Sequence, residues 1–264
     1  MSRKYYYLVS GLPNLVESVK GFDYLKIREE IVELLAKEDE ELLKLLLLRF
    51  DNENIINFLD KKEEFDSRGW FGAAQLEDAI SDPTELPNYL QVFLQNRKEE
   101  KENVSGQGSI AQLFQLYYRE IADKNAWFAE WADFCADIQN VVAAINARQL
   151  GIPVEKSVIP FNDNAEKITK SRAADFGLGH SLPWFEQISK NINNPILLEE
   201  AIDEIYWKKV DELSISPDCE FGIESVLGFM VKANSIERWL RLDTEEGMAR
   251  AQRLIDNLKL SLQK

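Results

Sequence analysis

Apolar residues spaced three and four positions apart dominate this chain. Between Tyr24 and Phe50 they alternate with Glu and Lys, which is typical of a helix that packs one face against a core. The stretch from Ile110 to Leu150 repeats the pattern more regularly. Gly151 and Pro153 follow it, as they commonly follow the end of a helix. These two stretches predict long helices.

Shorter amphipathic stretches predict helices in the rest of the chain. We expect them at Gln75–Ile80, Leu86–Asn96, Pro183–Asn191, Pro195–Leu213, Cys219–Leu242 and Thr244–Leu262. Tyr5–Val9 has β propensity but no evident pairing partner, so either a short strand or the start of a helix fits it. Hydrophilic or Gly/Pro-containing breaks fall at Ser67–Gly72, Asn96–Ser109 and Leu150–Asp163. The pattern predicts an all-α protein.

Charge narrows the possible partners. The 264 residues include 46 acidic and 31 basic side chains, a formal net charge of −15. Such a chain has no broad basic face that could bind the phosphates of a nucleic acid and displace their counterions. Binding to an anionic membrane surface is disfavoured for the same reason. The leading hydrophobic run is too short for a signal peptide, and the longest leucine cluster is too short to cross a bilayer. We expect a cytoplasmic protein.

Few residues are available for metal binding or nucleophilic catalysis. Two cysteines and one histidine cannot supply a zinc site that needs four Cys or His ligands. Any catalytic imidazole would have to be His180, which lies in a turn punctuated by Gly and Pro. A helical enzyme that uses His180 with Asp175 and Glu186 stays open as one alternative.

A polar pair recurs on two of the predicted helices. Asp51 and Asn54 precede two isoleucines, and Asp137 and Asn140 precede two valines. On a helix, residues three apart share a face, so each Asn would flank the apolar seam and bind a neighbouring helix or its end. The recurrence favours an internal repeat. The alternative is that these are ordinary helix-capping or surface residues.

A weaker third copy of the pair lies near the end of the chain. Ser235 and Arg238 stand there in place of the Asp and the Asn, and Trp239 and Leu240 take the positions of the two aliphatic residues. Three copies would divide the chain into about three helical units, each longer than the repeat of an ordinary solenoid.

The segment FCADIQNVVAAINARQLGIPVEKSVIPFND (Phe134–Asp163) resembles the central signature of the C-subunit family of V-type ATP synthases, whose eukaryotic members are called d. The residues that carry this resemblance are Asp137, Asn140, Ala147, Arg148, Gly151, Glu155, Ile159 and Pro160. Gly228–Leu242 is similar to the last-repeat helix of that family. Over most of its length the chain is closest to a short bacterial family encoded beside V-type ATP synthase genes. It departs from the C-subunit family in being shorter and in lacking Asp and Asn in the third copy.

The resemblance implies an all-α, funnel-like fold with pseudo-threefold symmetry. We expect a single domain over residues 1–264, with approximate repeats at 1–96, 109–180 and 181–264. The function implied is that of a non-catalytic connector without cofactor, metal or small-molecule substrate. It would join the D-type protein of the central stalk, with the F-type stalk protein as a further candidate, to the membrane c-ring, and so lie peripheral to the inner membrane.

Two further expectations concern partners. Trp70 and Phe71 lie in a predicted turn, and exposed aromatic residues often supply much of the binding energy at an interface. They are therefore candidates for contact with a partner. A helical scaffold of some other complex is the second alternative function.

Overall fold

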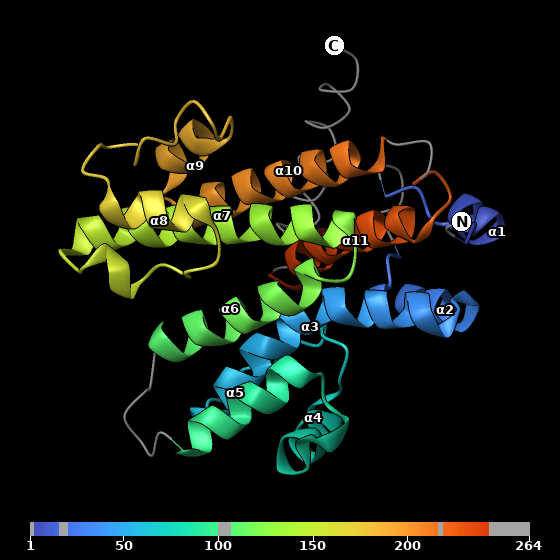
Figure 1. Ribbon diagram of the computed structural model, residues 1–264. Coiled ribbons are helices and arrows are strands. Elements are labelled where there is room, and N and C mark those ends of the chain that lie inside the picture. The colour runs from blue at the N-terminus through green and yellow to red at the C-terminus, as the bar shows by residue number, and fades with distance from the viewer. Residues whose placement is uncertain (1–2, 16–20, 100–106, 216–218, 243–264) are drawn as a thin grey trace. The chain divides into compact units, whose positions relative to one another are not determined.

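The computed structural model describes residues 3–15, 21–99, 107–215 and 219–242 (Figure 1). Within these ranges the regular elements are helices, which confirms the all-α prediction. Tyr5–Val9 is not a strand, because helix α1 spans Tyr6–Gly11. The helix expected at Thr244–Leu262 lies outside the described residues.

The chain divides into two compact units. One unit comprises residues 1–43 and 194–264, and the other comprises residues 44–193, so the boundary between residues 43 and 44 falls within α3 (Lys37–Leu59). The three repeats expected at 1–96, 109–180 and 181–264 do not follow these limits and stay a prediction. Each unit is described by itself.

In the first unit, α11 packs against both α10 and α2. Besides α1 and the first part of α3, its described helices are α2 (Tyr24–Leu34), α10 (Pro195–Ser214) and α11 (Ile223–Leu242). Leu15, Trp207, Ile236 and Trp239 form a buried cluster in this unit. Asn194 caps α10 by accepting hydrogen bonds from the backbone N–H groups of Ile196 and Leu197, a preferred arrangement at a helix start.

A buried carboxylate joins α10 to α11. Asp203 on α10 is 3% exposed and accepts hydrogen bonds from Ser235 Oγ (2.9 Å) and Trp239 Nε1 (2.6 Å). Arg238 also pairs with it. Several donors therefore converge on one buried charge, which is the condition under which a protein interior tolerates it.

We expect Asp203→Ala to lower the free energy of unfolding by about 3–5 kcal/mol, because the buried donors Ser235 Oγ and Trp239 Nε1 would lose their acceptor and Arg238 would keep Glu199 but lose this second carboxylate. Urea unfolding would measure this change. The control is Glu30→Ala, which removes an exposed ion pair with Lys26 and should change stability by less than about 0.5 kcal/mol. An equal effect of the two substitutions would contradict the role given to Asp203.

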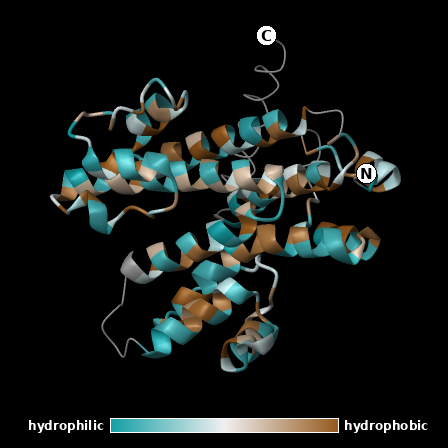
Figure 2. Cartoon of the chain, in the orientation of Figure 1, coloured by the Kyte–Doolittle hydropathy of each residue, from teal (hydrophilic) through white to brown (hydrophobic). Residues whose placement is uncertain are grey.

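In the second unit, α6 packs against α5 and α7, and α7 packs against α8 and α9. With the remainder of α3, the elements are α4 (Ala73–Ser81), the 3₁₀ helix η1 (Pro83–Glu85), α5 (Asn88–Glu99), α6 (Gln107–Ala122), α7 (Ala126–Leu150), the 3₁₀ helix η2 (Val154–Lys156), α8 (Asp163–Lys170) and α9 (Phe185–Asn191). Hydrophobic and hydrophilic residues lie on different sides of several of these helices, as in α5 (Figure 2).

Both long apolar stretches are broken once. The stretch from Ile110 to Leu150 is two helices, because Asn125 starts a new one by accepting a hydrogen bond from the backbone N–H of Phe128 (2.9 Å). The earlier stretch breaks between α2 and α3, where the Tyr5 hydroxyl accepts a hydrogen bond from the Ala36 N–H at 3.2 Å. At Asn125 a capping side chain thus starts a new helix although the apolar spacing continues across the break.

Candidate functional site: two clasped loops

The amides of Asn54 and Asn140 make the same pair of hydrogen bonds. Asn54 Nδ2 donates to the carbonyl of Asp66 (2.9 Å), and its Oδ1 accepts from the N–H of Asp66 (2.7 Å). Asn140 binds Ile159 in the same way, with the same two distances of 2.9 and 2.7 Å. Each Asn therefore satisfies both backbone polar groups of one residue in the loop that follows its own helix. We call this arrangement the loop clasp.

The structure corrects the expected partner of these residues. Neither Asn54 nor Asn140 binds a neighbouring helix or its end through these bonds. The loop instead returns along the helix that it leaves, and the Asn holds it there. Both side chains are buried, with exposed fractions of 2% and 0%. Buried backbone groups need hydrogen-bond partners, so the clasp removes a cost that the returning loop would otherwise carry.

In the first copy of the pair, the Asp that lies one turn before the Asn binds the same loop at residues further along the chain. The fully buried Asp51 accepts from the backbone N–H groups of Trp70 (2.6 Å) and Phe71 (3.4 Å), just before α4. Gly69 allows this close approach, because a Cβ at that position would lie 2.2 Å from Asp51 Oδ1. The sequence places Gly69 only within a predicted break, so its role becomes visible in the structure alone.

In the second copy, the corresponding Asp binds side chains instead. Asp137 accepts from the Nδ2 atoms of Asn162 (3.0 Å) and Asn164 (2.8 Å) at the start of α8. Burial raises the pKa of the Asp137 carboxyl, and these two hydrogen bonds act in the opposite direction. Asn162 also caps α8 by accepting from the N–H of Ala165 at 3.1 Å. The pair Asp137 and Asn140 thus fixes both the loop and the short helix that follows.

The other residues of the resemblance lie around the same loop. Arg148 donates to the carbonyls of Ala173 (2.5 Å) and Ser171 (2.8 Å), and its guanidinium lies 3.7 Å from the centre of the Phe176 ring. It therefore holds the segment that follows α8.

Gly151 and Pro160 mark the two ends of the loop itself. Gly151 ends α7 in the left-handed conformation, with φ of 68°, which suits glycine. The carbonyl of Pro160 accepts from Gln115 Nε2 on α6 at 2.6 Å. Each of these residues thus has a defined structural task in the second unit.

Ser235 and Arg238 have different partners from the first two copies. Both bind Asp203 on α10, and Arg238 also pairs with Glu199 on the same helix. The residues that follow α11 lie outside the described part of the chain. The third copy therefore contributes a contact between two helices in the first unit.

Trp70 and Phe71 are both half-buried. The Phe71 ring lies 5.9 Å from Lys44 Nζ, and the backbone of both residues is bound by Asp51. Their contact with a partner stays a prediction.

His180 is exposed, in the segment between α8 and α9. The nearby Asp175 carboxylate has a lowered pKa, chiefly because the N–H of Gly177 donates to it. Glu186 pairs with Lys190 at 2.7 Å. Among the described residues, no three His, Cys, Asp or Glu side chains are grouped as metal ligands would be, and no helix is long and apolar enough to cross a membrane.

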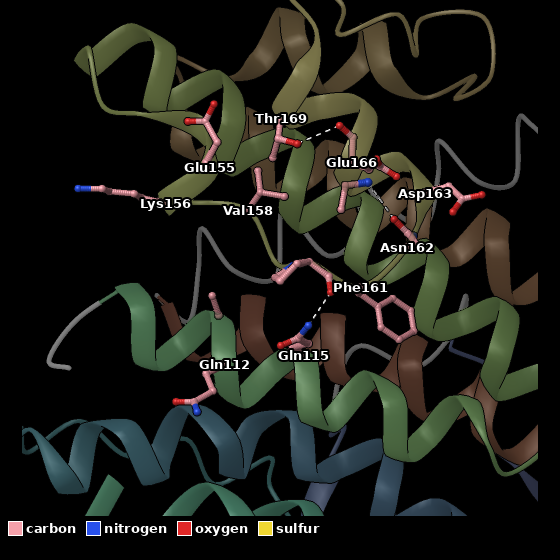
Figure 3. A pocket seen from close by; sticks show the side chains of 13 residues that line it. Gln112, Gln115, Glu155, Lys156, Val158, Phe161, Asn162, Asp163, Glu166 and Thr169 are labelled. Carbon is pink, nitrogen blue, oxygen red and sulfur yellow. Dashed lines mark hydrogen bonds between the residues drawn. The ribbon is translucent and has the colours of Figure 1, made fainter. Parts of the chain in front are cut away.

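A groove lies beside the second clasp, and we call it the α6–α8 groove. It has a volume of about 670 Å³ and is lined by residues of α6, of the loop 155–163 and of α8. Figure 3 shows Gln112 and Gln115 on α6, across the groove from Val158 and Thr169. Its volume falls within the range of about 300–1,000 Å³ that is common for ligand sites.

A family model described as "Protein of unknown function (DUF2764)" matches residues 1–261. The chain belongs to this family. No curated protein and no solved structure matches the chain.

Removing either clasping amide should destabilise the protein. We expect Asn54→Ala and Asn140→Ala each to lower the free energy of unfolding by about 2–4 kcal/mol, because each leaves a loop N–H and C=O without their partner. Chemical denaturation would measure the loss. Controls on the same helices are Asn57→Ala, which removes one exposed 3.3 Å hydrogen bond, and Asn146→Ala at a half-buried position. Clasp variants no less stable than these controls would refute the assignment.

Gly69→Ala should also destabilise the protein, because its Cβ would overlap the Asp51 carboxylate. We expect a loss of about 1–3 kcal/mol, in the range of overpacked interiors. The matched control is Gly11→Ala, since a Cβ at Gly11 meets nothing within 4 Å. Thermal melting of both variants would decide the matter: a melting temperature of Gly69→Ala at or above that of the control would show that the loop does not depend on this approach.

Proposed function

We propose that this protein is a non-catalytic central-stalk connector of a V-type ATPase or ATP synthase, similar to the C-subunit family. It would link the rotor shaft to the membrane c-ring and so take part in ion transport coupled to ATP synthesis or hydrolysis. In this role the chain binds the D-type protein of the shaft, with the F-type protein as a further candidate. It would act in the cytoplasm, peripheral to the inner membrane through the complex.

The loop clasp is the observation that carries this proposal. The residues on which the resemblance to the C-subunit family rests include Asp137 and Asn140, and these residues hold one loop against its own helix. Asp51 and Asn54 do the same for another loop. A repeated helix–loop unit of this kind suits a protein whose parts are copies arranged about an axis, as in the pseudo-threefold funnel of that family.

The mechanical demands of a connector agree with this construction. A part that passes torque between two partners has to keep its shape under load, and loops are usually the most mobile segments of a helical protein. In this chain two loops are fixed to their helices by hydrogen bonds from buried Asn side chains, and a third segment is held by Arg148. The proposed role requires no reacting side chain.

Two alternatives remain. A helical scaffold of another complex would use the same rigidity, and only its partners would differ. An enzyme that uses His180 would need this exposed side chain to act with Asp175 or Glu186. His180→Ala separates the enzyme from the connector, because the connector should retain its binding to the V-type complex.

We expect an affinity-tagged chain, expressed in its source cells, to co-purify with the detergent-extracted V-type complex, including the shaft and the c-ring. Mass spectrometry of the eluate would identify these components. The His180→Ala variant should recover the same components in the same amounts. Recovery of the chain without any component of the V-type complex would rule out the connector role.

A further inference from the structure

The rim of the α6–α8 groove carries an excess of negative charge. Its acidic side chains are Glu155, Asp163 and Glu166, all exposed, and Lys156 is the single basic residue among its lining residues. Glu166 already pairs with Lys170, which does not line the groove. Glu155 and Asp163 are therefore the carboxylates best placed to meet a cationic group.

Small and apolar side chains line the same groove. Ala111 on α6, Val158 and Pro160 in the loop, and Ala165 on α8 line the groove. Val158 and Ala165 are themselves buried, with exposed fractions of 5% and 2%. The groove thus combines apolar and acidic residues, together with the neutral polar side chains of Gln112, Gln115, Asn162 and Thr169, and protein interfaces also mix apolar and polar contacts.

The wall of this groove is held in place from several directions. Asn140 on α7 binds Ile159, Gln115 on α6 binds the carbonyl of Pro160, and Asp137 binds Asn162. Figure 3 shows the Gln115 side chain reaching across to this loop. A surface that is already ordered loses little conformational entropy when a partner binds, so more of the contact energy appears as affinity.

We propose that the α6–α8 groove docks a segment of the rotor shaft that presents Lys or Arg side chains beside small apolar ones. This inference rests on the proposed function and adds to it the surface and the chemistry of contact. The cationic side chains would meet Glu155 and Asp163, and the apolar ones would cover Ala111 and Val158. Charge complementarity at such a rim mainly sets the rate of association and its dependence on salt.

The test measures binding of the purified full chain to the purified rotor shaft, the D-type and F-type proteins of the same source, at low and at high salt. Wild type should bind more weakly at high salt. The double variant Glu155→Gln/Asp163→Asn should bind about fivefold more weakly at low salt and lose part of that salt dependence. Ala111→Trp should bind about tenfold more weakly, because the indole occupies the groove.

Matched changes outside the groove serve as controls. Glu77→Gln/Asp78→Asn removes the same number of charges from exposed positions of α4, and Ala74→Trp adds the same bulk at an exposed position. Both should bind as wild type does. Melting curves would show whether each variant folds. If Ala111→Trp does not fold, the double variant Glu155→Gln/Asp163→Asn decides whether the groove is the docking site, since its two positions are exposed.

The outcomes separate the two proposals. Weaker binding by the groove variants alone supports the docking site. Binding by the groove variants as strong as that of wild type would overturn the docking site and leave the connector role intact. If wild type itself does not bind the shaft, both proposals fail.

Discussion

A loop that returns along its own helix buries backbone N–H and C=O groups, and these must find partners inside the protein. Asn54 and Asn140 meet this constraint with one side chain each, because a primary amide offers a donor and an acceptor side by side. The positions at which helices α4 and α8 begin depend on this loop clasp. Without the clasp, the loops leaving α3 and α7 would need other partners for the backbone groups of Asp66 and Ile159.

The two copies share the Asn but use the Asp differently. Asp51 accepts from backbone amides, so the loop must come very close, and Gly69 makes that possible. Asp137 accepts instead from the side-chain amides of Asn162 and Asn164, so this contact depends on those two residues. In the third copy the roles of donor and acceptor are exchanged: the carboxylate belongs to Asp203 on α10, and α11 supplies the donors. The equivalent helix position, which is Asp51, Asp137 or Ser235, thus makes a different contact in each of the three copies.

Periodicity was sufficient to predict an all-α chain, because each long helix buries one face. It missed the starts of α3 and α7, since apolar spacing continues across both breaks and only a cap such as Asn125 marks the second. It also missed α8, where only Ala165 and Ile168 are buried, although Asn162 and the acidic residues Asp163 and Glu166 in the first turn signal a helix start. The Asp and Asn pair was found from spacing, but its partner was not, because the return of a loop depends on tertiary packing.

Long-range and local electrostatics have separate tasks in the proposed docking. The net charge of −15 attracts any cationic partner to the chain as a whole, and salt weakens that attraction wherever the partner lands. The groove determines where a partner docks, because its acidic and apolar residues lie beside a loop that Asn140 and Gln115 hold in place. Salt dependence by itself therefore cannot identify the site. A difference between charge removal at Glu155 and Asp163 and the same removal on α4 can identify it, since both double variants remove two negative charges and only one of them alters the groove.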